Sequence, residues 1–257
     1  MSEHWYDRQG KPCYEQPTQK GGLRATNLRD ARKLGLVPSV TTVLSVIDKP
    51  ALGTWKVKQG ILAALTLPRQ PDESEDAWLA RILTDSGEQA KAAAEEGTRI
   101  HDQCERALKG LSVIEDYRPH VEGVKACLAE LFPDVTDWVP EQSFAHPLGY
   151  GGKVDLHSPS TGIVVDYKGK DGDFTGGKKL AYDQHWQLAA YQVGLGLPRA
   201  PCANIFVSRT HPGCVAHHVW SAEDVEQGWR VFSAALGLWT HLKGFNPTFS
   251  PPMQAAA

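Results

Sequence analysis

The chain has 257 residues, of which 41% are hydrophobic and 22% are charged, and its formal net charge is -3 at pH 7. This composition is typical of a globular protein that can bury a sizeable core, and no apolar run in the sequence approaches the length of a membrane span. The small negative charge excludes a protein that coats nucleic acid by bulk electrostatic attraction, so any such binding must depend on local basic patches.

The N-terminal residues, MSEHWYDRQG, have neither the basic start nor the apolar stretch of a signal peptide, which predicts a cytoplasmic protein. The cysteines are odd in number, scattered and without a Cys-x-x-Cys pair: Cys13, Cys104, Cys127, Cys202 and Cys214. A structural zinc site, an iron–sulfur cluster and a disulfide framework are therefore not expected.

The first part of the chain is predicted to be a polar arm followed by helices. Residues 20–33 carry five basic side chains and one acid, which fits either a phosphate-contacting arm or a solvated loop and helix. Ser39 is a candidate helix cap ahead of an apolar run that ends at Pro50. Strong helix formers predict helices over 72–85 and 86–110, and in the second of these His101 lies beside the apolar stripe.

From Trp138 onward the sequence pattern changes from helical to extended, with turn-forming residues between the segments. A helix is predicted over 119–131, before this change. The elements predicted after it are strands over 138–147, 150–158 and 162–169, a helix over 182–197, strands over 202–209 and 214–220, and a helix over 221–244. This order predicts one α/β domain with a mixed central sheet flanked by helices.

Charged side chains interrupt two of the predicted strands. Asp166 and Lys168 follow a β-branched apolar run and project from one face, because side chains alternate along a strand. Asp155 lies on the preceding strand, and a hairpin around residues 158–162 would bring the two carboxylates together with the lysine. Mg²⁺ and Mn²⁺ prefer such oxygen ligands, which predicts a metal-dependent hydrolase.

Four short motifs resemble those of the PD-(D/E)XK nucleases, and specifically of their RecB-like exonuclease branch. They occur in the family's order: GTRIH ending at His101, GGKVD ending at Asp155, DYK from Asp166 to Lys168, and QLAAY from Gln187 to Tyr191. The segment PSVTTVLSV is also similar to the opening segment of phage and mitochondrial-type members. The resemblance runs from Pro38 to Trp220.

This resemblance implies a restriction-endonuclease-like core with an N-terminal helical elaboration. Residues 1–85 would form the arm and elaboration, residues 86–243 the catalytic core, and residues 244–257 a flexible tail. The implied activity is a Mg²⁺- or Mn²⁺-dependent DNA exonuclease of phage or bacterial recombination, repair or processing, in the cytoplasm of a bacterium or a phage-infected host. The implied partners are linear DNA ends, single- or double-stranded, and a recombinase, annealing protein or helicase, but no membrane.

Roles for individual residues follow from the resemblance and from their chemistry. Asp155, Asp166 and Lys168 are the expected catalytic residues. One or two metal ions would be held by His101, Asp155, Asp166 and the backbone carbonyl of Tyr167, with Glu141 as a candidate additional ligand or neighbour of the ligands. The expected substrate contacts come from the helix and loop after the catalytic strand: Gln187, Tyr191, Lys170, Lys178 and Lys179.

Other interpretations of the same residues stay open. His101 beside an apolar stripe also fits a hydrogen-bonded core histidine, and Asp166 with Lys168 also fits an ordinary ion pair. The same catalytic residues would serve a structure- or sequence-specific endonuclease, and the fold could also belong to a non-catalytic nucleic-acid-binding module.

Overall fold

A five-stranded mixed sheet forms the centre of the protein, in the order β5-β6-β7-β8-β9. The computed structural model describes residues 3–177 and 179–250. The strands are β5 (Val139–His146), β6 (Tyr150–His157), β7 (Val164–Lys170), β8 (Cys202–Ser208) and β9 (Val215–Trp220). Neighbours are antiparallel except β7 and β8, which are parallel and are joined through a helix. The predicted mixed α/β fold is confirmed.

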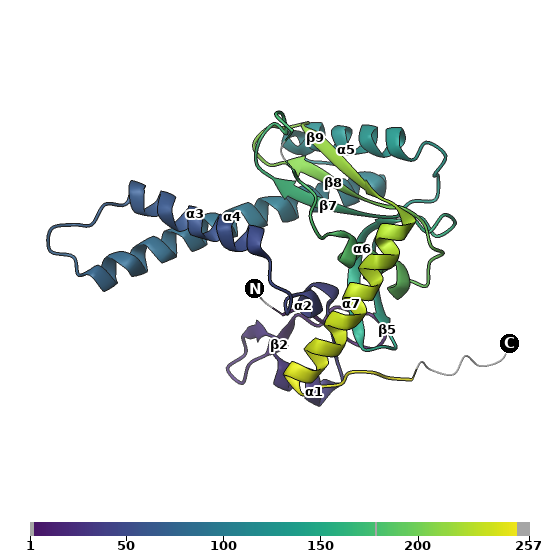
Figure 1. Ribbon diagram of the computed structural model, residues 1–257, viewed down its shortest axis with the longest axis horizontal. Coiled ribbons are helices and arrows are strands. Elements are labelled where there is room, and N and C mark those ends of the chain that lie inside the picture. Colours follow the sequence, from purple (N-terminus) through teal and green to yellow (C-terminus); the bar gives the residue numbers. More distant parts are fainter. Residues whose placement is uncertain (1–2, 178, 251–257) are drawn as a thin grey trace.

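Helices cover both faces of this sheet (Figure 1). Their bounds are α2 (Val40–Leu44), α6 (His185–Gly194) and α7 (Ala222–Lys243) around one hydrophobic cluster, and α5 (Arg118–Leu131) with the end of α4 (Glu75–Leu108) around the other. A short 3₁₀ turn, Glu115–Tyr117, precedes α5. Alternation along β7 sends Val164 into the first cluster and Val165 into the second, so both faces of the strand are buried.

The N-terminal segment, predicted to be a polar arm, packs onto the core. It contains β1 (Trp5–Tyr6), β2 (Glu15–Pro17), β3 (Leu23–Ala25), α1 (Leu28–Leu34) and β4 (Val37–Pro38). Trp5 is fully buried and its ring lies edge-on to that of Trp239 on α7, at 6.1 Å between centroids. Within the basic stretch, Arg24 pairs with Asp30 at 2.6 Å. This part of the chain therefore contributes a large aromatic anchor to the fold.

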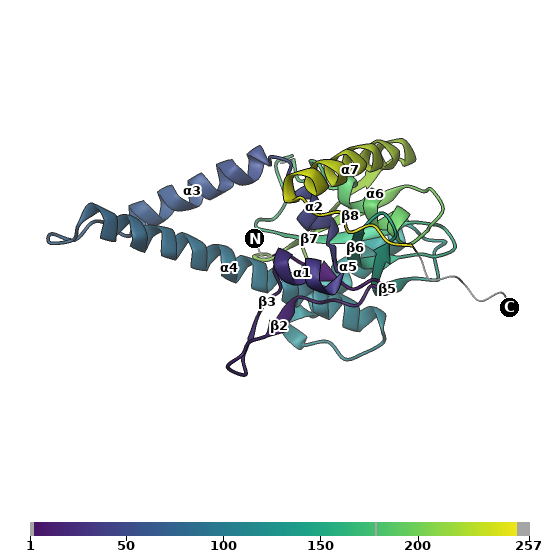
Figure 2. The ribbon, with the colours of Figure 1, turned by 90° about the horizontal axis from the view of Figure 1, so that it is seen from below.

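Helices α3 (Pro50–Thr66) and α4 form a hairpin that projects away from the sheet (Figure 1). The two helices separate from one another toward the sheet (Figure 2). Instead of the two helices predicted over 72–85 and 86–110, α4 is one helix of 34 residues, capped by Ser74. Gly87 does not end it, because strong helix formers on both sides offset the cost of about 1 kcal/mol for one glycine. The boundary expected at residue 85 thus falls inside a continuous helix.

The C-terminal helix begins and ends as its sequence indicates. Ser221 caps α7 in a capping box with Asp224, and Gly244 closes it in the left-handed conformation. Phe245 packs against Trp239, so the first part of the segment predicted as a tail lies on the core. Residues 251–257 of that segment lie outside the described residues. In the described part of the chain, no helix is both long and apolar enough to cross a membrane.

The turn between β6 and β7 sets Asp155 opposite Asp166 and depends on Gly162. This glycine has a φ of +77°, and a Cβ added to it would lie 2.1 Å from the carbonyl oxygen of Pro198. We expect Gly162→Ala to lower the free energy of unfolding by more than about 1 kcal/mol, through backbone strain and this clash. Urea denaturation measures the loss.

Gly196→Ala is the matched control. Gly196 also has a positive φ, +65°, but no described atom lies within 4 Å of its added Cβ. It should therefore show the strain alone, and an equal loss in both variants would contradict a role for the contact with Pro198.

Candidate active site

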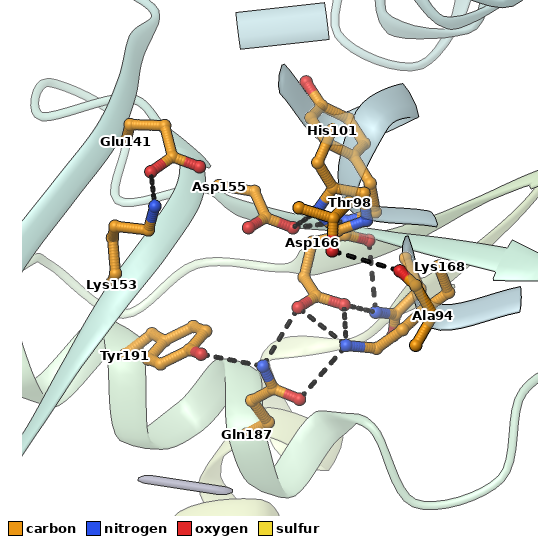
Figure 3. Close-up of polar contacts among 12 residues, drawn as sticks. Ala94, Thr98, His101, Glu141, Lys153, Asp155, Asp166, Lys168, Gln187 and Tyr191 are labelled. Carbon is orange, nitrogen blue, oxygen red and sulfur yellow. Dashed lines mark hydrogen bonds and ion pairs between the residues drawn. The ribbon is translucent and has the colours of Figure 1, made fainter. Parts of the chain in front are cut away.

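The two carboxylates meet where strands β6 and β7 separate. The two strands pair only at Leu156 with Val165 and at His157 with Val164. Beyond this point the Oδ2 atom of Asp155 accepts a hydrogen bond of 2.8 Å from the backbone N–H of Tyr167. The Asp155 carboxylate thus occupies the position of a backbone acceptor beside β7 (Figure 3).

His101 reaches this site from α4. Its Nδ1 atom lies 3.5 Å from Oδ2 of Asp155, and its ring is edge-on to Tyr167, with 5.7 Å between centroids. Burial lowers the pKa of His101, but the Asp155 carboxylate outweighs burial and leaves this pKa above its ordinary value. Burial likewise raises the pKa of Asp155, and His101 with Lys168 more than offsets it, so this pKa is lowered. Below the raised pKa of His101, the two residues form an ion pair at the base of the projecting hairpin.

Asp166 is buried, at 3% exposure. The Lys168 Nζ atom lies 2.9 Å from Oδ1 and 2.8 Å from Oδ2 of Asp166. Gln187 donates to Oδ1 at 3.0 Å, and Asn204 donates to Oδ2 at 2.8 Å. Burial lowers the pKa of Lys168, but attraction to Asp166 and Asp155 raises it above its ordinary value, so the ammonium stays charged.

Gln187 and Tyr191 lie one turn apart on α6 and face β7 (Figure 3). Gln187 accepts a hydrogen bond of 3.3 Å from Lys168 and donates one of 2.8 Å to the Tyr191 hydroxyl. Tyr191 is buried, and a Cβ on Gly152 would lie 2.8 Å from its ring. The glycine that opens the GKVD stretch therefore leaves room for the tyrosine of the following helix.

Glu141 lies on the far side of Asp155 from Asp166. The pairing of Pro140 with Leu156 and of Gln142 with Val154 sets Glu141 level with Asp155 on the neighbouring strand. Glu141 has a positive φ of 56° and forms an ion pair with Lys153. Burial raises the pKa of Glu141 although Lys153 opposes this. A second carboxylate–lysine pair therefore flanks Asp155.

Two of the predicted substrate lysines, Lys170 and Lys179, lie at the end of β7 and in the loop that follows. Lys170 ends β7, two residues after Lys168, and its carbonyl accepts a hydrogen bond of 2.8 Å from the Arg209 N–H. The Lys179 ammonium lies over the ring of Tyr182, 5.0 Å from its centroid. Lys178 lies outside the described residues. Contacts of these lysines with a substrate stay predictions, as does the role of the Tyr167 carbonyl.

The metal ligands expected from the sequence lie close together but face different partners. Among residues 3–177 and 179–250, no group of three or more His, Cys, Asp or Glu side chains is arranged to hold a metal ion. Asp155 faces His101, whereas both oxygens of Asp166 accept hydrogen bonds from protein donors. The donor types, two carboxylates and an imidazole, fit a divalent cation. The Lys168 ammonium already lies among oxygen atoms of Asp166 and Gln187, where an incoming cation would compete with it.

Two polar residues of the site were not predicted from the sequence. Asn204 contacts Asp166 from β8, and Lys153 contacts Glu141 from β6. Asn204 is the one amide in the otherwise small or apolar segment CANIFV, and a buried polar group needs a partner. Lys153 lies two residues before Asp155 and so shares its side of the strand. For Lys153 the signal was present in the sequence, whereas Asn204 could be linked to Asp166 only once β8 was known to lie beside β7.

The His101–Asp155 pair predicts a pH dependence of stability in the metal-free protein. Because the pKa of His101 is raised, its stabilisation is complete below the ordinary value of 6.5 and is lost as pH rises through the folded-state pKa. We expect the wild type in EDTA to lose free energy of unfolding relative to His101→Gln as pH rises from the ordinary value of 6.5 through the raised folded-state pKa. Urea denaturation across this range measures the difference, and parallel curves for the two proteins would contradict the pairing.

The lowered pKa of Asp155 makes the stability of the protein depend on pH in the acidic range. Its stabilisation is present above the ordinary value of 3.8 and is lost as pH falls through the folded-state pKa. The His101–Asp155 pair therefore stabilises the folded protein only at pH values between the folded-state pKa of Asp155 and that of His101.

Comparisons with known proteins give a distant structural likeness. No protein-family model matches the chain, and no curated protein matches it. The structure is similar to that of a phage-related exonuclease from Haemophilus somnus 129PT, with 15% identity and a TM-score of 0.30 over 71% of this chain and 93% of that one. It is also similar to the crystal structure of SSO0001, with 16% identity and a TM-score of 0.26 over 46% of this chain and 56% of that one.

Proposed function

We propose that this protein is a Mg²⁺- or Mn²⁺-dependent DNA exonuclease of the RecB-like branch of the PD-(D/E)XK nucleases. The observation that supports this most directly is the meeting of Asp155, Asp166 and Lys168 at the point where β6 and β7 separate. The order of the four sequence motifs supports the same proposal. An ordinary surface ion pair does not account for two enclosed carboxylates, one paired with a histidine and the other with a lysine.

In this proposal Asp155, Asp166, His101 and the Tyr167 carbonyl hold one or two divalent cations, with Glu141 nearby. When bound, such a cation offsets the negative charge of a phosphate and lowers the pKa of a water molecule that attacks phosphorus. The carboxylates contribute the negative charge that retains the cation.

Lys168 has two functions in the proposed mechanism. In the metal-free protein its ammonium neutralises Asp166, which would otherwise be a buried charge without a counter-ion. If a cation were held by Asp166, the ammonium could keep its hydrogen bond to Gln187 and would face the phosphate, where it would stabilise charge that builds up in the transition state. Tyr191 holds Gln187 in place through the amide hydrogen bond.

The test is the digestion of DNA labelled at its 5′ or its 3′ end, with the other end blocked, in the presence of Mg²⁺, Mn²⁺ or EDTA. We expect linear single- or double-stranded DNA to be shortened from one end, covalently closed circles to resist, and EDTA to stop the reaction. Cleavage of closed circles would replace the proposal by an endonuclease on the same fold. Binding of DNA without cleavage under any metal would replace it by a binding module.

A further inference from the structure

A buried amide outside the sequence motifs touches the proposed catalytic carboxylate. Asn204 lies on β8, directly beside Asp166 in the parallel β7–β8 pair, and is 0% exposed. Its Nδ2 atom donates to Oδ2 of Asp166 at 2.8 Å and approaches the Asp166 carbonyl oxygen at 3.3 Å. Every residue of β8 is buried, so no solvent can replace these hydrogen bonds.

The orientation of this amide is fixed by a second residue. The Oδ1 atom of Asn204 accepts a hydrogen bond of 2.8 Å from Nε1 of Trp220. An indole N–H can only donate, so the amide oxygen must face Trp220 and the NH₂ group must face Asp166. The opposite orientation would leave two donors facing each other and two acceptors facing each other. Trp220 therefore selects the orientation that is useful to Asp166.

Trp220 itself packs against two histidine rings. It ends β9, and its ring centroid lies 4.4 Å from that of His185 and 4.2 Å from that of His218. His185 is the first residue of α6, the helix that carries Gln187 two residues later. The same tryptophan thus packs against the start of the helix whose glutamine contacts the other oxygen of Asp166.

The two oxygens of Asp166 are consequently held from two sides. Gln187 contacts Oδ1 from α6, Asn204 contacts Oδ2 from β8, and Lys168 contacts both. Of these three partners, Lys168 is the one that a divalent cation would displace, because both are positive charges seeking the same oxygens. Asn204 and Gln187 are neutral donors, so they can keep the carboxylate oriented after such an exchange.

We infer that Asn204, oriented by Trp220, is a positioning residue that holds the Asp166 carboxylate for cation binding. This inference rests on the proposed function of the site. It predicts that the loss of either member weakens cation binding without removing a ligand.

The experiment compares shape-matched variants by titration calorimetry with Mn²⁺ alone, by cleavage kinetics, and by melting of the metal-free protein. Asn204→Leu removes the donor and keeps the side-chain shape, while Trp220→Phe keeps a ring beside the histidines but lacks the N–H. We expect Asn204→Leu to weaken Mn²⁺ binding by about ten- to a hundred-fold, which is typical for groups that orient metal ligands. Trp220→Phe should weaken it in the same direction but less, and the double variant no more than Asn204→Leu.

Gln192→Leu is the control for a merely structural buried amide. Gln192 is 4% exposed and donates to the carbonyl oxygens of Gly162 and Ala200, at 2.8 and 3.1 Å. This variant should lower the melting temperature and leave the Mn²⁺ affinity of the folded protein unchanged.

The outcomes distinguish failure of the positioning role of Asn204 from failure of the proposed nuclease function. If Asn204→Leu and Trp220→Phe bind Mn²⁺ and cleave DNA like the wild type, the positioning role is overturned while the nuclease stands. If Asn204→Leu does not fold, the Trp220→Phe result decides alone: weakened binding supports the inference and wild-type binding overturns it. A wild type that neither binds Mn²⁺ nor cleaves DNA overturns the proposed function, and the inference with it.

Discussion

Asp166→Asn is expected to reduce phosphodiester hydrolysis by at least about a thousand-fold, because cation stabilisation of the transition state amounts to several kcal/mol and each 1.4 kcal/mol is about ten-fold in rate. The substitution keeps the shape of the side chain and removes its charge. Asp155→Asn should have an effect of the same order. End-labelled oligonucleotides and saturating Mg²⁺ give the rate constants.

DNA binding by the same variants should persist or strengthen, because repulsion between the carboxylate and the phosphate is removed. Fluorescence anisotropy of a labelled oligonucleotide measures this. Asp171→Asn is the matched control, since Asp171 is exposed and pairs with Arg209. A wild-type cleavage rate in Asp166→Asn at saturating Mg²⁺ would remove this residue from the site.

Lys168→Met should change cleavage and cation binding in opposite directions. Methionine keeps much of the apolar stem but has no charge to stabilise the transition state, so we expect kcat to fall by about a hundred- to a thousand-fold. The Asp166 carboxylate loses its competing ammonium, so Mn²⁺ should bind as tightly as in the wild type or more tightly. Single-turnover cleavage and calorimetric titration measure the two effects separately.

The exposed Lys125 on α5 offers the control for loss of a lysine charge, and Lys125→Met should leave both quantities unchanged. Parallel weakening of cleavage and of Mn²⁺ binding in Lys168→Met would show that Lys168 only maintains the structure of the site. The metal-free Lys168→Met protein should also melt at a lower temperature, because Asp166 is then buried without its counter-ion.

Local periodicity carried much of the information needed to predict the site. The alternation of β7 sets Asp166 and Lys168 on one face, and the turn around Gly162 sets Asp155 beside them. These contacts join residues that are close in the sequence or lie in one short hairpin. The alternation of side chains along a strand and the turn-forming residues are therefore enough to predict them. The spacing of Gln187 and Tyr191 is local in the same sense and predicts a shared helix face.

Long-range partners could not be read from the sequence in this way. Trp5 lies in a polar segment and is buried by Trp239, which follows it by most of the length of the chain. Asn204 becomes informative only when β8 is known to lie beside β7, a pairing that depends on the crossover through α6. The continuity of α4 through Gly87 was also missed, because a Ser-Gly pair that usually interrupts a helix is outweighed by its surroundings.

Helix α4 forms one side of the projecting hairpin and also carries His101. Leu79 near the hairpin tip and His101 at the site lie on the same uninterrupted α4, roughly 33 Å apart along its axis at 1.5 Å per residue. Each residue of a helix turns by about 100°, so one residue inserted into α4 above His101 would rotate the tip by that angle around the helix axis. A deletion of seven residues, close to two full turns, would shorten the hairpin and leave its tip facing nearly its original direction. The direction in which the hairpin tip faces is therefore set by the number of residues in α4 between the tip and His101.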